Sequence, residues 1–228
     1  SSNKCVSAFK KYLYMKFDGY CLPGIYAEEA MDHFVGNHGQ RLRLPNLVDD
    51  VSYQHAISKR KDTYELRLKY GIPAKKRVFF CPARLLKLKG LDLFLKSAGK
   101  VKGISNACFL LAGEGPMKKE LQDIADKENL DVHFMGYCNQ DTVIEFYALS
   151  DFFFLPSLQD CNPLSAIEAA FAGLPLCVSI YTGNSPELIQ PYKNGVVFDI
   201  LDTEEVQACI YFLLNASEEW VSNAGRES

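Results

Sequence analysis

Residues 152–175 read FFFLPSLQDCNPLSAIEAAFAGLP, and this stretch decides the fold. It opens with four consecutive apolar residues at 152–155, continues through a loop and passes into a helical segment of small residues at 164–172. A continuous apolar strand is typical of a parallel sheet that helices cover on both faces, because a strand with one wet face alternates apolar and polar residues. The stretch therefore predicts one strand–loop–helix unit of a parallel α/β sheet.

The same alternation of strand and helix extends in both directions from this stretch. Strands are predicted at 77–82, 107–112, 132–135, 176–180 and 195–199, and helices at 91–101, 116–129, 141–149, 186–189, 204–215 and 218–224. This pattern predicts a doubly wound, Rossmann-like α/β domain over residues 76–228, with about six parallel strands. Such domains bind ligands beyond the carboxyl ends of their strands, so the residues that follow each strand are the functional candidates.

Residues 1–46 form a separate and smaller α/β pattern. Helices are predicted at 4–17 and 26–38, and short strands at 18–22 and 42–44. Gly39 is expected to end the second helix, since glycine readily takes the left-handed backbone of a helix C-terminus. Residues 47–75 are rich in charge, and we interpret them as a connector between the two domains. The run Lys59-Arg60-Lys61-Asp62 within them predicts a solvated face.

Charge and composition exclude several classes of function. The 228 residues include 25 Lys and Arg against 28 Asp and Glu, a formal net charge of −3. No nucleic-acid partner is expected from so mildly acidic a chain. No apolar stretch reaches the roughly 18 residues that a membrane span needs. The chain begins at Ser1 without methionine, and we interpret it as a fragment of a longer protein.

The cysteines and histidines show no metal-binding or catalytic spacing. None of the eight cysteines forms a C-x-x-C pair, and several lie in apolar runs, which favours reduced core thiols in a cytoplasmic protein. The four histidines show no triad, and His133, between two apolar residues, is interpreted as a satisfied core histidine. We therefore predict no metal and no cofactor.

Two loops after the first strands of the large domain carry candidate ligand contacts. Arg84 and Lys89 flank the loop after strand 77–82, where two cations could hold a diphosphate or be ordinary surface charges. Gly113 and Gly115 follow strand 107–112, but Lys118 occupies the third glycine position of a dinucleotide fingerprint. Their turn could let the backbone approach a ligand, or it could be purely structural.

The loop and helix after strand 152–155 carry the strongest signal. Asp160 lies in the loop, and Glu168 lies within an otherwise apolar helix, where an unpartnered charge is costly to bury. A ribose diol would satisfy that carboxylate, and backbone N–H groups near Leu164 and Ser165 could meet a phosphate. The alternative is a structural ion pair with a helix cap. In the next loop, Ser185 before Pro186 predicts a helix N-cap.

These residues resemble the retaining GT-B glycosyltransferases of the GT4 type, which use nucleotide-sugar donors. The matching positions are Arg84 with Lys89-Gly90, the turn Gly113 to Pro116, Asp160 with Glu168, Gly173-Leu174-Pro175, and the interdomain segment Pro45 to Asp49. The sequence departs from the family pattern at Asp160, where glutamate is usual, and at Asn162, where an aromatic residue is frequent. Most of the family's acceptor-binding domain has no counterpart in residues 1–46.

The resemblance implies a function and a set of roles. Arg84, Lys89 and Asp160 would be catalytic: the two cations would bind the donor diphosphate, and Asp160 the transferred sugar. The donor-binding residues would be Glu168 on the ribose, with Gly113, Gly115, Asn162, Pro163, Leu164 and Ser165. The expected reaction is sugar transfer, with retention, to a saccharide or lipid-linked acceptor in cell-surface polysaccharide synthesis.

Two expectations concern the fragment and its location. The chain alone is expected to be inactive, and an acceptor-side domain could associate peripherally with a membrane. Two other functions stay open: a nucleotide-sugar-binding module without catalysis, and a nucleotide-dependent oxidoreductase.

Overall fold

The computed structural model describes residues 2–60 and 63–227, and the chain forms two compact units, Ser1–Leu47 and Val48–Ser228. The smaller unit contains α1 (Ser2–Tyr14), β1 (Gly19–Leu22), α2 (Ile25–Val35) and β2 (Gln40–Arg43). Its two strands pair in parallel, and Tyr20, Leu22 and Val35 form its core. The helix α2 ends at Gly36, with φ of 56°, so the prediction that Gly39 ends it is wrong. Gly39 instead precedes β2.

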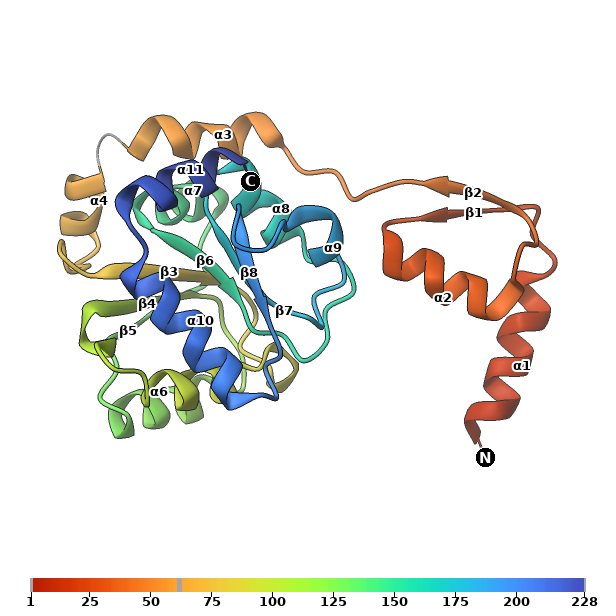
Figure 1. The fold of residues 1–228 in the computed structure, drawn as a ribbon, viewed down its shortest axis with the longest axis horizontal. Helices are drawn as coiled ribbons and strands as arrows, with labels where there is room; N and C mark the ends of the chain where they lie inside the picture. Colours follow the sequence, from red (N-terminus) through yellow and green to blue (C-terminus); the bar gives the residue numbers. More distant parts are fainter. Residues whose placement is uncertain (1, 61–62, 228) are drawn as a thin grey trace. The chain divides into compact units, whose positions relative to one another are not determined.

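The larger unit holds a six-stranded, entirely parallel sheet (Figure 1). Its strands are β3 (Arg77–Pro82), β4 (Ala107–Ala112), β5 (Val132–Gly136), β6 (Phe152–Leu155), β7 (Leu176–Ser179) and β8 (Gly195–Phe198). The strand order is β5-β4-β3-β6-β7-β8. The predicted doubly wound α/β fold is confirmed, and the predicted strands match within one residue at each end.

Helices flank this sheet on both faces. They are α3 (Asp50–Lys59), α4 (Thr63–Lys69), α5 (Leu91–Ala98), α6 (Lys118–Lys127), α7 (Gln140–Leu149), α8 (Leu164–Phe171), α9 (Ser185–Leu188), α10 (Thr203–Asn215) and α11 (Glu218–Glu227). The helix α5 packs against α6 and α10, whereas α7 packs against α3 and α4. Two short 3₁₀ turns, η2 (Lys87–Lys89) and η3 (Ile104–Asn106), precede α5 and β4.

Adjacent phenylalanines of β3 supply the core on opposite faces of the sheet. Phe79 packs against Phe109 and Phe154, while its neighbour Phe80 packs against Phe146 and Tyr147 of α7. All six of these aromatic side chains are fully buried. Successive residues of a strand point to opposite faces, so an unbroken apolar strand is what a sheet buried on both sides requires.

Residues 48–75, interpreted as part of a connector, belong to the larger unit and form α3 and α4. The Arg60 side chain is partly buried and donates to the Gly173 carbonyl oxygen at 2.9 Å, near the end of α8. Lys59 Nζ lies 3.8 Å from the carboxylate oxygen Oε1 of Glu145. The prediction of a solvated charged face is therefore wrong for Arg60, because its guanidinium satisfies a helix C-terminus. Lys61 and Asp62 lie outside the described residues.

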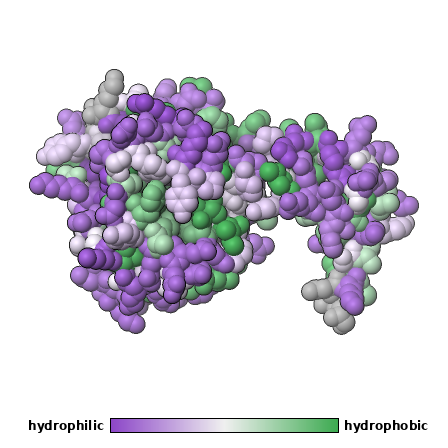
Figure 2. Space-filling model, in the orientation of Figure 1, coloured by the Kyte–Doolittle hydropathy of each residue, from purple (hydrophilic) through white to green (hydrophobic). Residues whose placement is uncertain are grey.

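The surface in Figure 2 is mostly hydrophilic, with hydrophobic residues in scattered groups. Within residues 2–60 and 63–227, no helix combines the length and apolar character that crossing a bilayer requires. All eight cysteines are free thiols. Cys81, Cys108, Cys177 and Cys209 are buried, as expected of core thiols, whereas Cys5, Cys21 and Cys161 are exposed.

Candidate functional site

The strand order reverses between β3 and β6. From β3 the chain adds β4 and β5 on one side, and then returns to place β6, β7 and β8 on the other. At such a switch point the loops that follow the two central strands diverge and leave a crevice at the carboxyl ends. Here the Leu158 N–H, after β6, donates to the Leu88 carbonyl oxygen, after β3, at 2.8 Å. The two loops that carry Lys89 and Asp160 are therefore joined.

Lys89 and Asp160 form an ion pair at this point. The lysine Nζ donates to the carboxylate Oδ2, and both side chains keep about a fifth or less of their surface exposed (21% and 16%). Partial exposure leaves both charges within reach of a ligand. The donor-site hypothesis depends on Arg84, Lys89, Asp160 and Glu168, and the structure brings two of these, Lys89 and Asp160, into direct contact.

Backbone contacts hold the loop around Asp160. The Asp160 N–H donates to the Tyr181 carbonyl oxygen at 3.2 Å, and the Gly183 N–H donates to the Asp160 carbonyl oxygen at 2.7 Å. A Cβ atom at Gly183 would lie 1.9 Å from the Cys161 carbonyl oxygen, so only glycine fits there. The loops after β6 and β7 therefore pack backbone against backbone and fix the position of the carboxylate.

Gly113 and Gly115 serve the same kind of close packing between the loops after β3 and β4. A Cβ atom at Gly113 would lie 2.1 Å from the Ala83 carbonyl oxygen, and one at Gly115 would lie 2.3 Å from the Leu85 carbonyl oxygen. The Leu85 N–H donates to the Glu114 carbonyl oxygen at 3.0 Å. The structural interpretation of this turn is thus supported, and a contact with donor stays a prediction.

Arg84 is exposed and lines an open hollow of about 480 Å³ at the carboxyl ends of β3, β4 and β5. Gly113 and Glu114 form one wall, and Tyr137 and Cys138, which follow β5, form another. An exposed guanidinium beside an open hollow can reach an anion in that hollow. Arg84 is thus at the same edge of the sheet as the Lys89–Asp160 pair.

Glu168 lies on α8 and its partners are two tyrosines. The Tyr147 hydroxyl lies 3.0 Å from Glu168 Oε2 and 3.1 Å from the Ser165 carbonyl oxygen, and the Tyr53 hydroxyl of α3 lies near the same carboxylate. Burial first, and then the charge of Glu168, raise the pKa of both tyrosine hydroxyls. These phenols therefore stay protonated and can donate to the Glu168 carboxylate. A neutral donor thus takes the place of the ion pair that was the alternative expectation for Glu168.

The start of α8 is held by Asn184. Its Nδ2 donates to Asn162 Oδ1 and to the Pro163 carbonyl oxygen, both at 3.0 Å. Leu164 and Ser165 form the first turn of α8, where backbone N–H groups have no partner within the helix and can bind an anion. Asn184, rather than the predicted Ser185, occupies the N-cap of α9, and Ser185 is its buried first residue.

Sequence reasoning missed Tyr53, Tyr147 and Asn184. Tyr53 lies in the charge-rich segment interpreted as a connector, and Tyr147 lies in a helix whose other residues are mostly apolar. Their link to Glu168 depends on how α3 and α7 pack against α8, which no local pattern encodes. The sequence contains a weak indication that Asn184 has a role, because it lies in the loop after a strand, directly before Ser185-Pro186.

A six-stranded parallel sheet with Arg84, Lys89 and Asp160 at the carboxyl ends of its strands defines a Rossmann-like ligand-binding domain. The chain belongs to the glycosyl transferases group 1 family, whose sequence profile matches residues 62–226. This confirms the family that the sequence motifs resemble.

Two curated relatives illustrate the family. The sulfoquinovosyl transferase of Arabidopsis thaliana is 31% identical over 193 residues, which cover 82% of this chain and 36% of that protein. The GDP-mannose-dependent monoacylated alpha-(1-6)-phosphatidylinositol monomannoside mannosyltransferase of Corynebacterium glutamicum is 26% identical over 188 residues, covering 79% of this chain and 48% of that protein. This chain thus spans less than half the length of either relative.

Among solved structures, sucrose-phosphate synthase from Thermosynechococcus elongatus superposes with a TM-score of 0.81 at 18% identity. The match covers 98% of this chain and 55% of that one. At this identity the likeness establishes the fold, and function must be argued from the site.

Proposed function

We propose that this chain is the donor-binding part of a retaining glycosyltransferase, and that it binds a nucleotide sugar in the crevice between β3 and β6. The observation that carries the proposal is the meeting of Lys89 and Asp160 at the switch point of the sheet. A diphosphate needs a cation and a sugar needs hydroxyl acceptors, and this pair offers one of each in the same place.

In the proposed complex, Lys89 and Arg84 bind the diphosphate, and the first turn of α8 adds backbone donors from Leu164 and Ser165. These groups stabilise the negative charge that develops on the leaving nucleotide as the bond between the sugar's anomeric carbon and the diphosphate breaks. Glu168 uses its remaining acceptor capacity for the ribose hydroxyls. Asp160 accepts from hydroxyls of the transferred sugar once the diphosphate competes for Lys89.

We infer retention of the anomeric configuration, with the departing diphosphate helping to deprotonate the acceptor. The site offers Asp160 as a carboxylate near the sugar, and we assign it a role in positioning rather than in proton transfer. The acceptor is proposed to be a saccharide or a lipid-linked sugar of the cell surface. The Corynebacterium relative, whose named substrate is a mannosylated phosphatidylinositol, supports this class of acceptor.

The donor assignment is tested by calorimetry with UDP-, GDP- and ADP-sugars. One class is expected to bind at a single site, and Lys89→Ala is expected to weaken that binding. Binding of NAD in preference to every nucleotide sugar would favour the oxidoreductase alternative instead.

The catalytic assignment needs separate measurements. Because the chain spans less than half of its curated relatives, we propose that it binds donor but turns over little or no substrate alone. A nucleotide-release assay on the 228 residues tests this, and rapid turnover contradicts it. In a form that carries an acceptor-binding domain, proton NMR of the product's anomeric coupling tests retention. An inert longer form that still binds donor would indicate a binding module without catalysis.

A further inference from the structure

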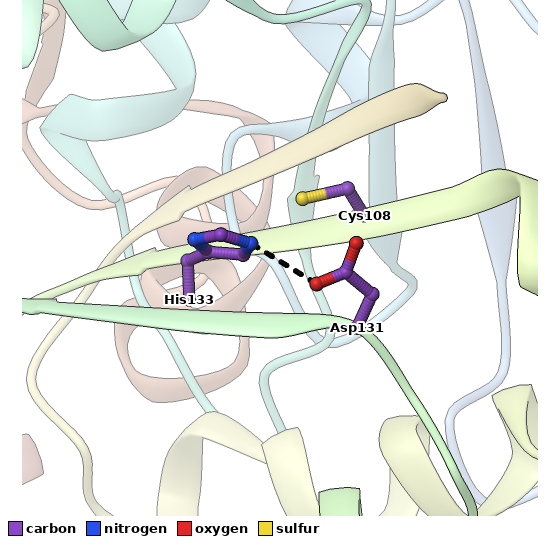
Figure 3. A group of neighbouring side chains, drawn as sticks. All are labelled: Cys108, Asp131 and His133. Atoms are coloured by element: carbon purple, nitrogen blue, oxygen red, sulfur yellow. Dashed lines mark hydrogen bonds and ion pairs between the residues drawn. The ribbon is translucent and has the colours of Figure 1, made fainter. Parts of the chain in front are cut away.

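A cysteine, an aspartate and a histidine lie together at the opposite end of the sheet from Lys89 and Asp160. Cys108 is in β4, His133 is in β5, and Asp131 directly precedes β5. Figure 3 shows the three side chains turned toward one another, and one ligand atom from each lies within 4.8 Å of the other two. Leu110 pairs with His133 in the ladder, so Cys108, two residues earlier, lies on the same face of the sheet as Asp131.

We propose that Cys108, Asp131 and His133 form a binding site for a divalent transition metal of the Zn²⁺ class. This site is separate from the proposed donor crevice, because it lies at the amino ends of β4 and β5. The proposal departs from the sequence-based expectation of no metal.

The donor set selects the class of metal. One sulfur, one imidazole nitrogen and one carboxylate oxygen suit Zn²⁺ or Co²⁺, whereas Mg²⁺ and Ca²⁺ prefer oxygen ligands alone. Three protein ligands leave a fourth position of a tetrahedron for water. That position is accessible, since Asp131 and His133 each keep 25% of their side-chain surface exposed.

The spacing is close to what a tetrahedral ion requires. With metal–ligand bonds of about 2.0–2.3 Å, tetrahedral ligands lie about 3.4–3.6 Å apart. His133 Nε2 and Asp131 Oδ1 are 3.0 Å apart and hydrogen-bonded, and all three ligand atoms are within 4.8 Å. An ion would replace the hydrogen bond between Asp131 and His133, with side-chain shifts of about 1 Å.

Lys76 sets the strength of the proposed site. Its Nζ lies 2.9 Å from Asp131 Oδ2, on the other oxygen of the carboxylate. The ammonium thus leaves Oδ1 for a metal but opposes a second cation by its charge. Burial raises the pKa of the Cys108 thiol to about 12, so an ion must displace that proton to bind the thiolate.

The consequence of metal binding would be structural. The strand β5 is at the edge of the sheet and pairs with β4 alone. A metal bridging Cys108 to Asp131 and His133 would fasten that edge strand to its neighbour. Metal binding should therefore raise thermal stability without changing affinity for a nucleotide sugar.

The experiment uses the whole chain, treated with a chelator and a non-thiol reductant and then titrated with Co²⁺. One equivalent of Co²⁺ is expected to give a thiolate-to-cobalt charge-transfer band, and Zn²⁺ is expected to abolish that band by competition. Cys108→Ala is expected to lose the band, and His133→Ala is expected to weaken Zn²⁺ binding at least about tenfold. The matched control, Cys138→Ala near the other end of β5, is expected to keep both the cobalt band and the Zn²⁺ affinity.

A second variant keeps the proposal testable if Cys108→Ala does not fold. Lys76→Met keeps all three ligands and removes the competing charge, so it is expected to bind Zn²⁺ more tightly than the unchanged chain. The proposal is overturned if no sulfur-to-cobalt band appears, if Cys108→Ala keeps it, or if Lys76→Met leaves Zn²⁺ affinity unchanged.

Discussion

Lys89 and Asp160 are 71 positions apart in the chain and form an ion pair where the loops after β3 and β6 meet. Each charge therefore already has a partner, so an anionic ligand that binds Lys89 must compete with Asp160. The charge balance of the proposed donor site depends on both residues, and changes at the two positions should have opposite effects on a bound diphosphate.

Lys89→Ala should weaken binding of a nucleoside diphosphate by about 1.5–3 kcal/mol, the usual contribution of a charge-assisted hydrogen bond. The variant removes the cation and leaves Asp160 to repel the phosphates. Calorimetry with UDP and GDP measures the effect. Lys127→Ala, at the exposed end of α6, is the control and should leave affinity unchanged.

Asp160→Asn should tighten binding of the same free nucleotide, because the amide releases Lys89 and carries no negative charge. Calorimetry on this variant gives the sign directly. If Asp160→Asn and Lys89→Ala weaken nucleotide binding equally, Asp160 does not compete with the diphosphate and the proposed arrangement is wrong.

Glu168→Ala should weaken binding of a nucleotide sugar by about 1.5–3 kcal/mol if its carboxylate accepts from the ribose. The comparison is with Tyr147→Phe, which removes a hydroxyl partner of Glu168 but keeps the carboxylate and the buried ring. That variant should lose unfolding free energy, by about 1–3 kcal/mol, and retain more of the affinity. Unchanged affinity in Glu168→Ala would refute the ribose assignment.

Gly115→Ala should lower the free energy of unfolding by about 1–3 kcal/mol, since its Cβ would meet the Leu85 carbonyl oxygen at 2.3 Å. Urea unfolding of the variant measures the loss. Gly19→Ala in β1 is the control, because the nearest atom to its Cβ would be at an ordinary 3.5 Å. Equal effects at the two glycines would contradict the close packing of the loops.

Cys81 predicts a pH dependence of stability. Burial raises the pKa of its thiol from 9.0 to about 12, so the unfolded chain loses this proton at lower pH than the folded chain does. The contribution is fully present below pH 9 and is lost as pH rises toward about 12. Urea unfolding under reducing conditions between pH 8 and 10.5 should show a shallower decline for Cys81→Ala than for the unchanged chain. Parallel declines would contradict the raised pKa.

Local sequence was sufficient for most of the fold. The apolar runs Val78-Phe79-Phe80 and 152–155 indicated strands buried on both faces, and β3, β4 and β6 lie where they were predicted. Ligands of such sheets bind beyond the carboxyl ends of the strands, so the predicted strands also placed Arg84, Lys89 and Asp160 at one edge of the sheet. Helix ends were less accurate: the α2 end lies three residues before Gly39 and the α9 N-cap lies one residue before Ser185, since neighbouring residues can cap the same helix.

The sequence by itself determined the strand–helix alternation, the family and the residues that follow each strand. These features depend on short-range periodicity and on the spacing of motifs. Only the tertiary structure decided which partners those residues meet. Glu168 contacts Tyr53 and Tyr147, and Asp160 pairs with Lys89, because helix packing and strand order bring distant positions together. Hydrogen bonds and ion pairs act over a few ångströms, and the distance between two side chains is fixed only when the whole sheet has formed.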